Sequence, residues 1–586
     1  MWFYLGLGIY ALLWFAALEF NKNTLVGWAL ALLLFVGYAL LLRRWMPRAR
    51  WFVKLGVFLA LTLTLAGVLR FTEGPVRLRP GVEGKNPAVT EIVTVEQGQL
   101  TGLVTADGAV EVYTGIPYAA PPVGDLRWRE PQEPESWEGV YAADHFAPMS
   151  MQVVNPPIVS SLTQLIGYHD YTISLSDNFR DAVSEDALYL NIWKPAGAQE
   201  KLPVLVYIHG GSLQTGQPWY ADYSGEGLAR KGVIAVNLGY RLGVFGFLAD
   251  EELAAESPNG TTGNYGLLDQ IQALKWVQKN IAAFGGDPEN VTLAGESAGS
   301  ACVSALCVSP LAKGLFVRAI GESSSVTAPV PAHSFRTLDE ALETGKATKA
   351  RFGAASIEEL RQLPAETLAA AMDVNHHITV DGYVLPTTPY EAYRAGEHNE
   401  SALLHGYNAE EGTPFILFNM AKLSNYESLV RTLFGESADE VLALYPAASD
   451  AEARQNWIEL YSVWFFCYGH YCWGRQAALD VPVYEYYFTK TNGRLGAWHS
   501  GEEIYCYHNI PASSKLYDET DRALSDSFSD YFVNFIRTGD PNGEGLPAWE
   551  ATADGAQLLE LGDTVGMTQE RYLKLYEILD RKIGYT

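Results

Sequence analysis

The segment Gly295-Glu-Ser297-Ala-Gly299 constrains the fold of this chain more than any other. Residues 291–294 before it are apolar and strand-like, and residues 300–305 after it form a helix-like run of small side chains. Glycines two residues away on each side of the serine allow a sharp strand-to-helix turn that lifts the hydroxyl out of the sheet. The first amides of the following helix then point toward a reacting carbonyl. We therefore take Ser297 as the candidate nucleophile.

A second glycine-containing loop lies upstream of this turn. The serine motif alone is a weak signal in a chain with 54 glycines among 586 residues, so the order of the other elements matters. Residues 202–208 are apolar and β-branched, which is typical of a buried strand, and they lead into His209-Gly210-Gly211-Ser212. Glycines at a strand exit let backbone amides approach a ligand closely. We predict that an oxyanion hole is lined by Gly210, Gly211, Ser212 and Ala298.

A candidate acid follows the serine along the chain. The apolar residues 402–406 run into Tyr407-Asn-Ala-Glu-Glu411-Gly412, where Glu410 and Glu411 both qualify by position. The chain order Ser, then Asp or Glu, then His is that of the α/β-hydrolase triad. Either glutamate is also compatible with an ordinary surface charge, so the residues themselves leave the choice open.

Three histidines follow the candidate acids: His470, His499 and His508. Residues 481–490 have the pattern of a last strand, and His499 lies in the loop after it. Its position favours His499 as the general base, with His508, nine residues further on, as the alternative. Apolar strands near residues 203–208, 233–238, 291–294, 401–405 and 482–488 alternate with helix-like stretches, which indicates an α/β fold.

From about residue 92 to the C-terminus, the chain resembles the type-B carboxylesterases, the family that includes the cholinesterases. The resemblance rests on many segments in the same order, among them Gly115-Ile-Pro-Tyr-Ala119, Ser184-Glu-Asp-Ala-Leu-Tyr-Leu-Asn191, Phe284-Gly-Gly-Asp-Pro-Glu-Asn290 and Asn534-Phe-Ile-Arg-Thr-Gly-Asp-Pro-Asn542. It implies an α/β-hydrolase fold with a large central, mostly parallel sheet and helical lid insertions, over residues 91–586. It also implies a serine esterase that acts through an acyl-enzyme intermediate.

The resemblance selects among the candidates. In the family pattern the acid directly precedes the glycine, which implies Glu411 rather than Glu410. A histidine followed by a carboxylate pair implies His499 rather than His508. Ser323 matches a family serine that would hydrogen-bond the acid and orient it, and Glu296 is placed beside the triad as well.

Three departures limit what the resemblance implies. Ser212 replaces the third glycine usual in the oxyanion loop, which argues against bulky tertiary-alcohol esters. The tryptophan that cholinesterases carry near Asp177 is missing, and Phe179 is the only aromatic residue nearby, so acetylcholine specificity is not implied. Ala187 stands where animal relatives place a cysteine, which favours a bacterial source.

The N-terminal part is strongly apolar. Residues 2–18, 24–42 and 55–69 carry no charge, and with their flanks each approaches the roughly 20 residues needed to cross a bilayer. Three such stretches in tandem are not a signal peptide. We predict a membrane anchor over residues 1–70, with helices at about 2–20, 24–42 and 52–70.

Charge predicts the orientation of this anchor. Residues 43–50 contain four arginines and Lys54 follows, whereas the loop after the first span offers only Lys22. The positive-inside rule places the basic loop in the cytoplasm and the C-terminal domain outside, tethered by a linker at residues 71–90. We therefore expect an integral protein of a bacterial cell membrane with an extracytoplasmic catalytic domain.

Composition restricts the partners. Residues 1–80 hold 9 Lys and Arg against 2 Asp and Glu, which leaves 32 against 66 in the remainder, a net charge of −34. So acidic a domain excludes nucleic-acid binding. We expect an ester substrate and a lipid bilayer as partners, neither metal nor cofactor, and free thiols at the five cysteines, whose spacing is not that of a metal site.

Two other functions stay open at this point. One is a non-catalytic, cholinesterase-like binding or adhesion domain on a membrane stalk, although such relatives commonly lose the nucleophile and this chain keeps Ser297. The other is hydrolysis of thioesters, carbamates or amides by the same triad, since all pass through a similar tetrahedral intermediate. The natural ester, its acyl length and the oligomeric state are not predicted.

Overall fold

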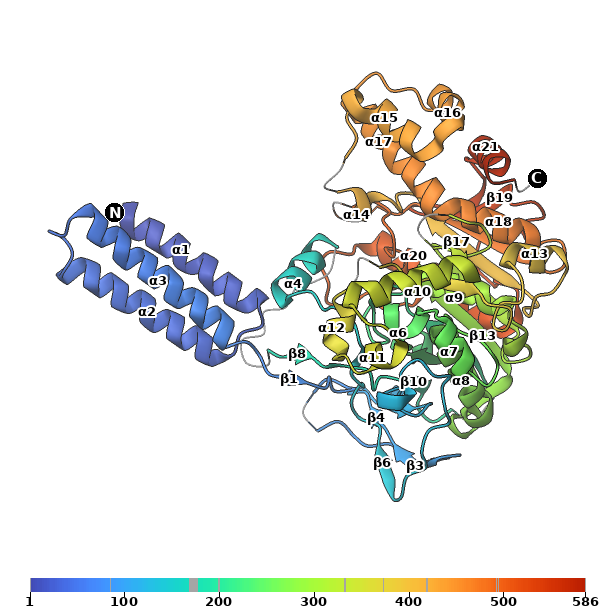
Figure 1. Ribbon diagram of the computed structural model, residues 1–586, viewed down its shortest axis with the longest axis horizontal. Helices are drawn as coiled ribbons and strands as arrows, with labels where there is room; N and C mark the ends of the chain where they lie inside the picture. The colour runs from blue at the N-terminus through green and yellow to red at the C-terminus, as the bar shows by residue number, and fades with distance from the viewer. Residues whose placement is uncertain are drawn as a thin grey trace. The chain divides into compact units, whose positions relative to one another are not determined.

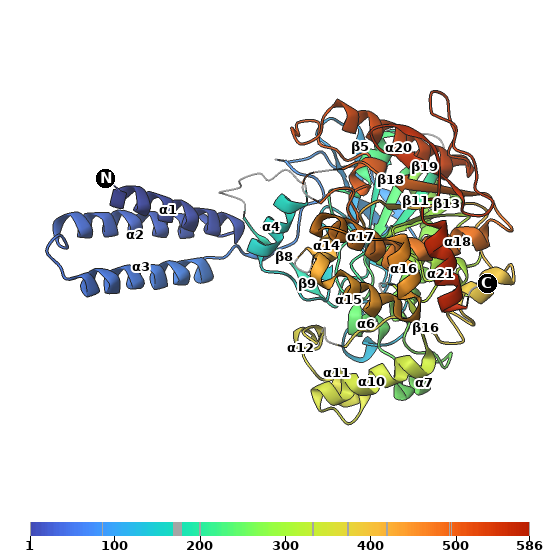
Figure 2. The same cartoon turned by 90° about the horizontal axis from the view of Figure 1, so that it is seen from above.

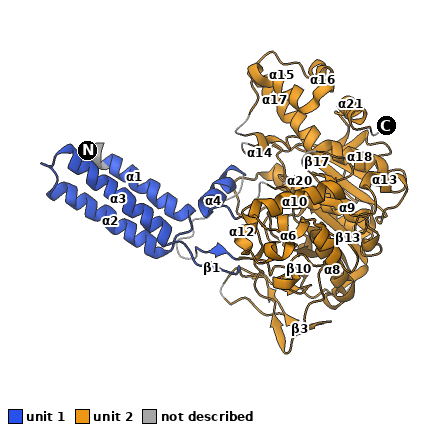
Figure 3. Cartoon of the chain, viewed as in Figure 1, with its two compact units in different colours: residues 1–79, 154–182 blue, residues 80–153, 183–586 orange. Residues whose placement is uncertain are grey.

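The chain was analysed as a computed structural model that describes residues 2–84, 86–167, 178–198, 201–330, 333–371, 374–417, 420–491, 493 and 495–584. The position of Asp177 lies outside these residues. The chain divides into two compact units (Figure 3). Unit 1 comprises residues 1–79 and 154–182, and unit 2 comprises residues 80–153 and 183–586. The predicted domain boundaries differ from this division, because residues 154–182 group with the N-terminal helices.

Unit 2 is built on an 11-stranded sheet with the strand order β20-β19-β18-β17-β14-β13-β11-β12-β10-β5-β4 (Figure 1). Neighbouring strands from β12 through β19 run parallel, and antiparallel strands complete both edges. This is the large, mostly parallel sheet of the predicted α/β-hydrolase fold. The strands are β4 (Leu103–Val104), β5 (Val110–Pro117), β10 (Tyr189–Pro195), β11 (Leu202–Ile208), β12 (Ile234–Leu238), β13 (Gly286–Glu296), β14 (Arg318–Glu322), β17 (Leu403–Asn408), β18 (Val483–Phe488), β19 (Gln557–Leu561) and β20 (Val565–Gln569).

The central strands are largely apolar and buried because helices cover both faces of the sheet. Figure 2 shows α20 (Glu519–Thr538) on one side and α18 (Tyr468–Ala477) on the other. The side chains of β12, β17 and β18 are all buried. Further helices near the sheet are α5 (Glu226–Arg230), α6 (Gly243–Phe247), α7 (Glu251–Glu256), α8 (Tyr265–Asn280), α9 (Ala298–Cys307), α19 (Glu503–Cys506) and α21 (Leu573–Ile583).

Helical insertions follow β14 and β17. The first contains α10 (Leu338–Phe352), α11 (Ile357–Arg361), α12 (Ala365–Ala369) and α13 (Pro389–Arg394). The second contains α14 (Thr413–Ile416), α15 (Leu423–Phe434), α16 (Ala438–Leu444), α17 (Asp450–Ser462) and the π-helical turn η5 (Val463–Cys467). The predicted lid insertions thus have counterparts in the structure, and the five predicted strands are all present.

Unit 1 contains three apolar helices, α1 (Trp2–Phe20), α2 (Leu25–Arg44) and α3 (Trp51–Phe71). Two of them, α2 and α3, are long and apolar enough to cross a membrane, whereas the part of α1 with described side chains, Leu5–Phe20, is shorter than a full span. The predicted linker also has structure, since β1 (Val76–Arg77) pairs in parallel with β8 (Arg180–Asp181).

Candidate active site

The turn at Ser297 has the strained geometry that its glycines predict. Ser297 lies between β13 and α9 with φ 54° and ψ −124°, a conformation that costs about 1–3 kcal/mol in a non-glycine residue. A Cβ on Gly299 would lie 2.0 Å from the carbonyl oxygen of Ile208, and one on Gly295 would lie 2.6 Å from the backbone of Gly299. Only glycine therefore lets the strand, the turn and the helix pack this closely.

The structure brings three of the predicted residues together. Ser297 Oγ lies 2.8 Å from His499 Nε2, and His499 Nδ1 lies 2.5 Å from Glu411 Oε2. All three side chains are buried, although they come from the ends of different strands: the serine follows β13, the glutamate follows β17 and the histidine follows β18. The amide of Asn408 donates to the other oxygen of Glu411 at 2.7 Å. Both oxygens of the carboxylate are thus held in place.

The alternative residues point elsewhere. His508 is bonded to Asp526 at 2.8 Å, and His470 stacks on His405 in the core. Glu410 accepts from the amide of Ala497 at 3.1 Å, two residues before His499. Of the three late histidines, His499 is the one that contacts Ser297.

The upstream glycine loop lies beside the serine. A Cβ on Gly210 would come within 2.9 Å of the Ser297 Cβ, so the loop backbone passes directly over the nucleophile. Gly211 and Ser212 both have positive φ, and the amide of Thr215 donates to the Gly211 carbonyl at 2.9 Å, which closes a tight turn. Ala298 is the first residue of α9, so its amide has no partner within the helix. The side chain of Ser212 is exposed.

Buried carboxylates lie around the histidine, and one of them, Glu296, was expected beside it from the sequence. Glu296 Oε1 lies 3.2 Å from His499 Nε2 and accepts from Ser500 Oγ at 2.6 Å. Burial lowers the pKa of His499, but the charges of Glu296 and Glu411 outweigh it and raise that pKa to about 9. Burial in turn raises the pKa of Glu296.

Ser323 was predicted to hydrogen-bond Glu411, and the structure gives it a different partner. Ser323 Oγ donates to Glu502 at 3.0 Å instead of to Glu411. The other oxygen of Glu502 accepts from Asn408 Nδ2, and burial together with the charge of Glu411 raises its pKa to about 8. Glu502 therefore connects the serine to the acid loop. Glu502 belongs to the carboxylate pair that follows His499, and this pair was the sequence feature from which its role could have been predicted.

Two phenylalanines enclose the histidine and were also missed. The rings of Phe415 and Phe466 lie 5.3 and 4.5 Å from the imidazole ring of His499. Phe415 comes from α14 and is half exposed, and Phe466 comes from the π-helical turn η5. Single π-helical turns of this kind are frequent at functional sites. These rings give the triad an apolar wall.

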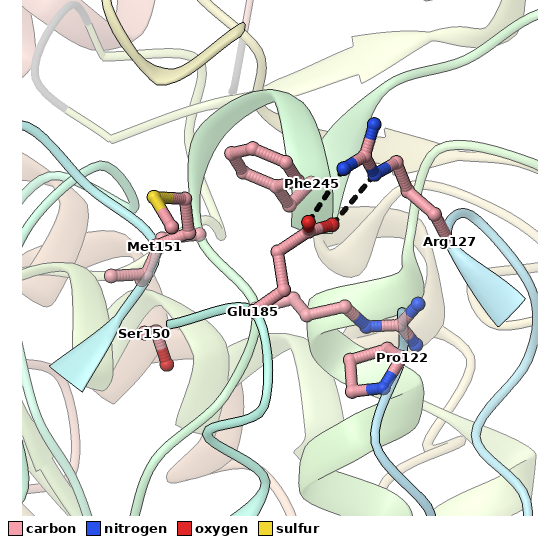
Figure 4. A pocket seen from close by; sticks show the side chains of 8 residues that line it. Pro122, Arg127, Ser150, Met151, Glu185 and Phe245 are labelled. Carbon is pink, nitrogen blue, oxygen red and sulfur yellow. Dashed lines mark hydrogen bonds and ion pairs between the residues drawn. The ribbon is translucent and has the colours of Figure 1, made fainter. Parts of the chain in front are cut away.

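A separate small pocket contains charges that are already paired (Figure 4). Arg127 forms two hydrogen bonds to Glu185, of 2.6 and 2.5 Å, and Arg241 forms two to Asp269, of 2.8 and 2.7 Å. No residue of the triad lines this pocket. These paired charges therefore serve the fold and do not create a second reaction centre there.

Comparisons with known proteins show the family of this chain. The model of the family described as "Carboxylesterase family" matches residues 89–578. Fumonisin B1 esterase of Sphingopyxis macrogoltabida is 34% identical over 497 residues, which cover 78% of this chain and 85% of that protein. Carboxylesterase 1C of Rattus norvegicus is 31% identical over 521 residues (83% and 92%), and the protein named "Fatty acyl-CoA hydrolase precursor, medium chain" of Anas platyrhynchos is 30% identical over 538 residues (85% and 92%).

Proposed function

The chain belongs to the carboxylesterase family and is an esterase, and from this premise we propose that it is a membrane-anchored serine carboxylic-ester hydrolase whose triad is Ser297, His499 and Glu411. The observation that carries the proposal is the continuous hydrogen-bond chain from Ser297 Oγ through the imidazole to Glu411. A serine hydroxyl, a histidine and an orienting carboxylate in this geometry form an activated nucleophile.

The chemistry follows from the distances. His499 Nε2 accepts the proton of Ser297 as Oγ attacks the ester carbonyl, and Glu411 at Nδ1 holds the tautomer and stabilises the imidazolium. The amides of Gly211, Ser212 and Ala298 hold the oxyanion, while Gly210 leaves room for the loop to pass over the serine. The imidazolium then protonates the leaving alcohol. Water, activated by the same histidine, hydrolyses the acyl-enzyme.

The test replaces Ser297 by Ala in the full chain and measures hydrolysis of p-nitrophenyl esters of graded acyl length. We expect loss of turnover for every ester and loss of labelling by a fluorescent organophosphonate. An unchanged thermal unfolding curve would show that the variant is folded. Turnover within tenfold of the unchanged protein would exclude Ser297 as the nucleophile.

The membrane part of the proposal rests on apolar side chains that the protein leaves uncovered. Leu12, Leu33 and Leu63 expose 70%, 67% and 74% of their surface, and such large apolar patches are rare on soluble proteins. Trp45 lies within the basic segment 43–50 and Trp51 directly follows it, and both are exposed, as expected of aromatic residues at a membrane surface. The proposed location is a bacterial cell membrane, with unit 2 outside the cytoplasm.

Two measurements test the anchor and its orientation. The full chain should stay in the membrane fraction after an alkaline carbonate wash, and its recovery in the supernatant would contradict the anchor. Protease added to intact spheroplasts should degrade unit 2. Protection until the membrane is lysed would show the opposite orientation.

Thioester hydrolysis is a second candidate activity. The duck relative is named as a fatty acyl-CoA hydrolase, and a thioester passes through a similar tetrahedral intermediate at the same serine. Release of free CoA from acyl-CoA substrates of graded chain length, measured against the corresponding p-nitrophenyl esters, compares the two activities. Absence of CoA release would leave ester hydrolysis alone.

A further inference from the structure

Residues 154–182, called the excursion below, belong to unit 1 but are inserted in the sequence between two parts of unit 2. The strands β7 (Met149–Ser150) and β9 (Val183–Ser184) pair in parallel, with Met149 opposite Val183, so the two ends of the excursion are held together. Just before it leaves, Gln152 exchanges two hydrogen bonds with Gly216, of 2.7 and 3.0 Å, at the end of the oxyanion loop. Residues just before the segment are thus bonded to the backbone that follows the oxyanion loop.

The excursion is bonded to the N-terminal helices, with which it forms unit 1. Asn178 is buried and its Nδ2 donates to the carbonyl of Asn23 at 3.0 Å. Arg180 forms an ion pair with Glu73 at 2.8 Å and donates to the Gly74 carbonyl at 3.1 Å. These contacts attach the excursion to the end of the helical unit at which α2 begins and α3 ends.

The excursion begins with a short amphipathic helix, α4 (Pro157–Ile166), which is fixed beside α1. The hydroxyl of Ser161 is buried and donates to the carbonyl of Phe20, the last residue of α1, at 3.1 Å. Residues 147–167 contain no charged side chain. At 100° per residue, the apolar side chains of α4 fall on one face, with Ser160, Ser161 and Gln164 on the other.

The apolar face of α4 is uncovered. Between 39% and 48% of the surface of each of four side chains is exposed: Val159, Leu162, Leu165 and Ile166. Phe71, the last residue of α3, is 86% exposed, and the amide of Thr24 donates to the Thr72 carbonyl at 2.9 Å, which places the start of α2 beside that end of α3. The uncovered face thus lies at the same end of unit 1 as the termini of the proposed spans.

We propose that α4 is an in-plane membrane helix, whose apolar face lies at the boundary between headgroups and acyl chains of the bilayer that the N-terminal helices cross. The inference rests on the membrane anchor of the proposed function. Its occupant is lipid because α4 packs beside α1 at the end of the apolar helices where Phe71 is also exposed, and because an amphipathic helix with an uncovered apolar face at the end of a spanning helix suits the interfacial region.

The test uses the full chain in phosphatidylcholine vesicles, with single thiols labelled by an environment-sensitive NBD maleimide. The five native cysteines are buried and free, so the label goes to the introduced thiol under native conditions. Leu162→Cys reports the apolar face of α4, Gln164→Cys is the matched control on its polar face, and Leu33→Cys reports the middle of α2. Ester turnover of each labelled protein verifies that it is folded.

We expect NBD at position 162 to emit at shorter wavelength than at 164, and to be quenched at least twofold more by lipids carrying a doxyl group near the headgroup. Position 33 should be quenched by doxyl groups deeper in the chain. Water-like emission at 162 with quenching at 33 would overturn this inference and leave the anchor intact. Water-like emission at 33 would overturn the anchor, and with it this inference.

Two other results would also contradict it. Equal quenching at 162 and 164 would place all of α4 inside the bilayer. A blue-shifted but unquenched label at 162 would mean that protein covers the face, and crosslinking through the thiol would then identify a second copy of the chain.

Discussion

Leucine side chains are buried in the central strands of unit 2, and many are largely exposed in unit 1. In unit 2, Leu205 and Leu293 of the central strands are at most 1% exposed, whereas in unit 1 Leu12 and Leu63 expose more than two thirds of their surface. The buried polar groups differ in kind, since unit 2 buries several carboxylates around His499 and unit 1 buries amide side chains such as Asn23 and Asn178. A sheet can bury paired polar groups because neighbouring elements satisfy them, while a helix in lipid must satisfy its backbone alone. The comparison supports the proposal that the helices of unit 1 face lipid while unit 2 is folded for water.

The largest expected effect is a loss of catalysis in unit 2 that leaves the proposed membrane anchoring by unit 1 unchanged. Replacement of His499 by Ala should lower kcat by about 10⁶-fold, because Ser297 loses its general base. The membrane fraction of the protein should not change. His508→Ala is the matched control, because that side chain bonds to Asp526 on α20, and its turnover should stay within a few-fold of the unchanged protein. Equal losses in both variants would contradict the assignment.

A second pair of variants tests which glutamate orients the base. Glu411→Gln should lower kcat by about 10⁴-fold, since an amide at this position favours the wrong imidazole tautomer. Glu410→Gln should have a much smaller effect, because that carboxylate accepts from the Ala497 amide and does not contact the imidazole. Steady-state kinetics with one ester compares the two. A larger loss in Glu410→Gln would reverse the assignment.

The division into units predicts a specific weakness in a shortened chain. A fragment of residues 80–586 keeps the triad, so we expect its ester turnover to stay within tenfold. It loses the partners of residues 154–182, including Asn23 and Glu73, so limited proteolysis should cut that segment at least tenfold faster than in the full chain. Mass spectrometry of the fragments locates the cuts. Equal protection in both proteins would mean that the excursion belongs with unit 2.

The smallest expected effect is on the pH profile. The raised pKa of His499, about 9, means that the neutral base forms only as the pH rises through that value, so kcat/KM should still be increasing above neutral pH. Glu296→Gln removes a negative charge near the imidazole, which lowers the pKa of His499. The rising limb of the plot of kcat/KM against pH should therefore shift to lower pH by about one unit.

Glu251→Gln serves as the control for that profile. This exposed residue of α7 changes the net charge by the same amount without contacting the triad. The limb of the control should coincide with that of the unchanged protein. An unmoved limb in Glu296→Gln would show that Glu296 does not set the protonation of the base.

Local sequence was sufficient to predict the elements whose structure depends on neighbouring residues in the chain. The turn at Ser297 needs glycines at fixed positions, and the apolar runs that became β11 and β18 have the length and composition of buried strands, so both were predictable. The same holds for the apolar N-terminal helices. The choice of Glu411 and His499 required the family pattern, because spacing alone left two acids and two bases open.

Only the tertiary structure decided which groups meet across the ends of different strands. Ser323 was expected to bond the acid, but it bonds Glu502, which lies 179 positions away in the chain. The association of residues 154–182 with the N-terminal helices also has no local signal, since it depends on single contacts such as Asn178 with Asn23. Sequence periodicity specifies which face of an element is apolar, whereas the partner of a buried polar group depends on the register and packing of distant elements.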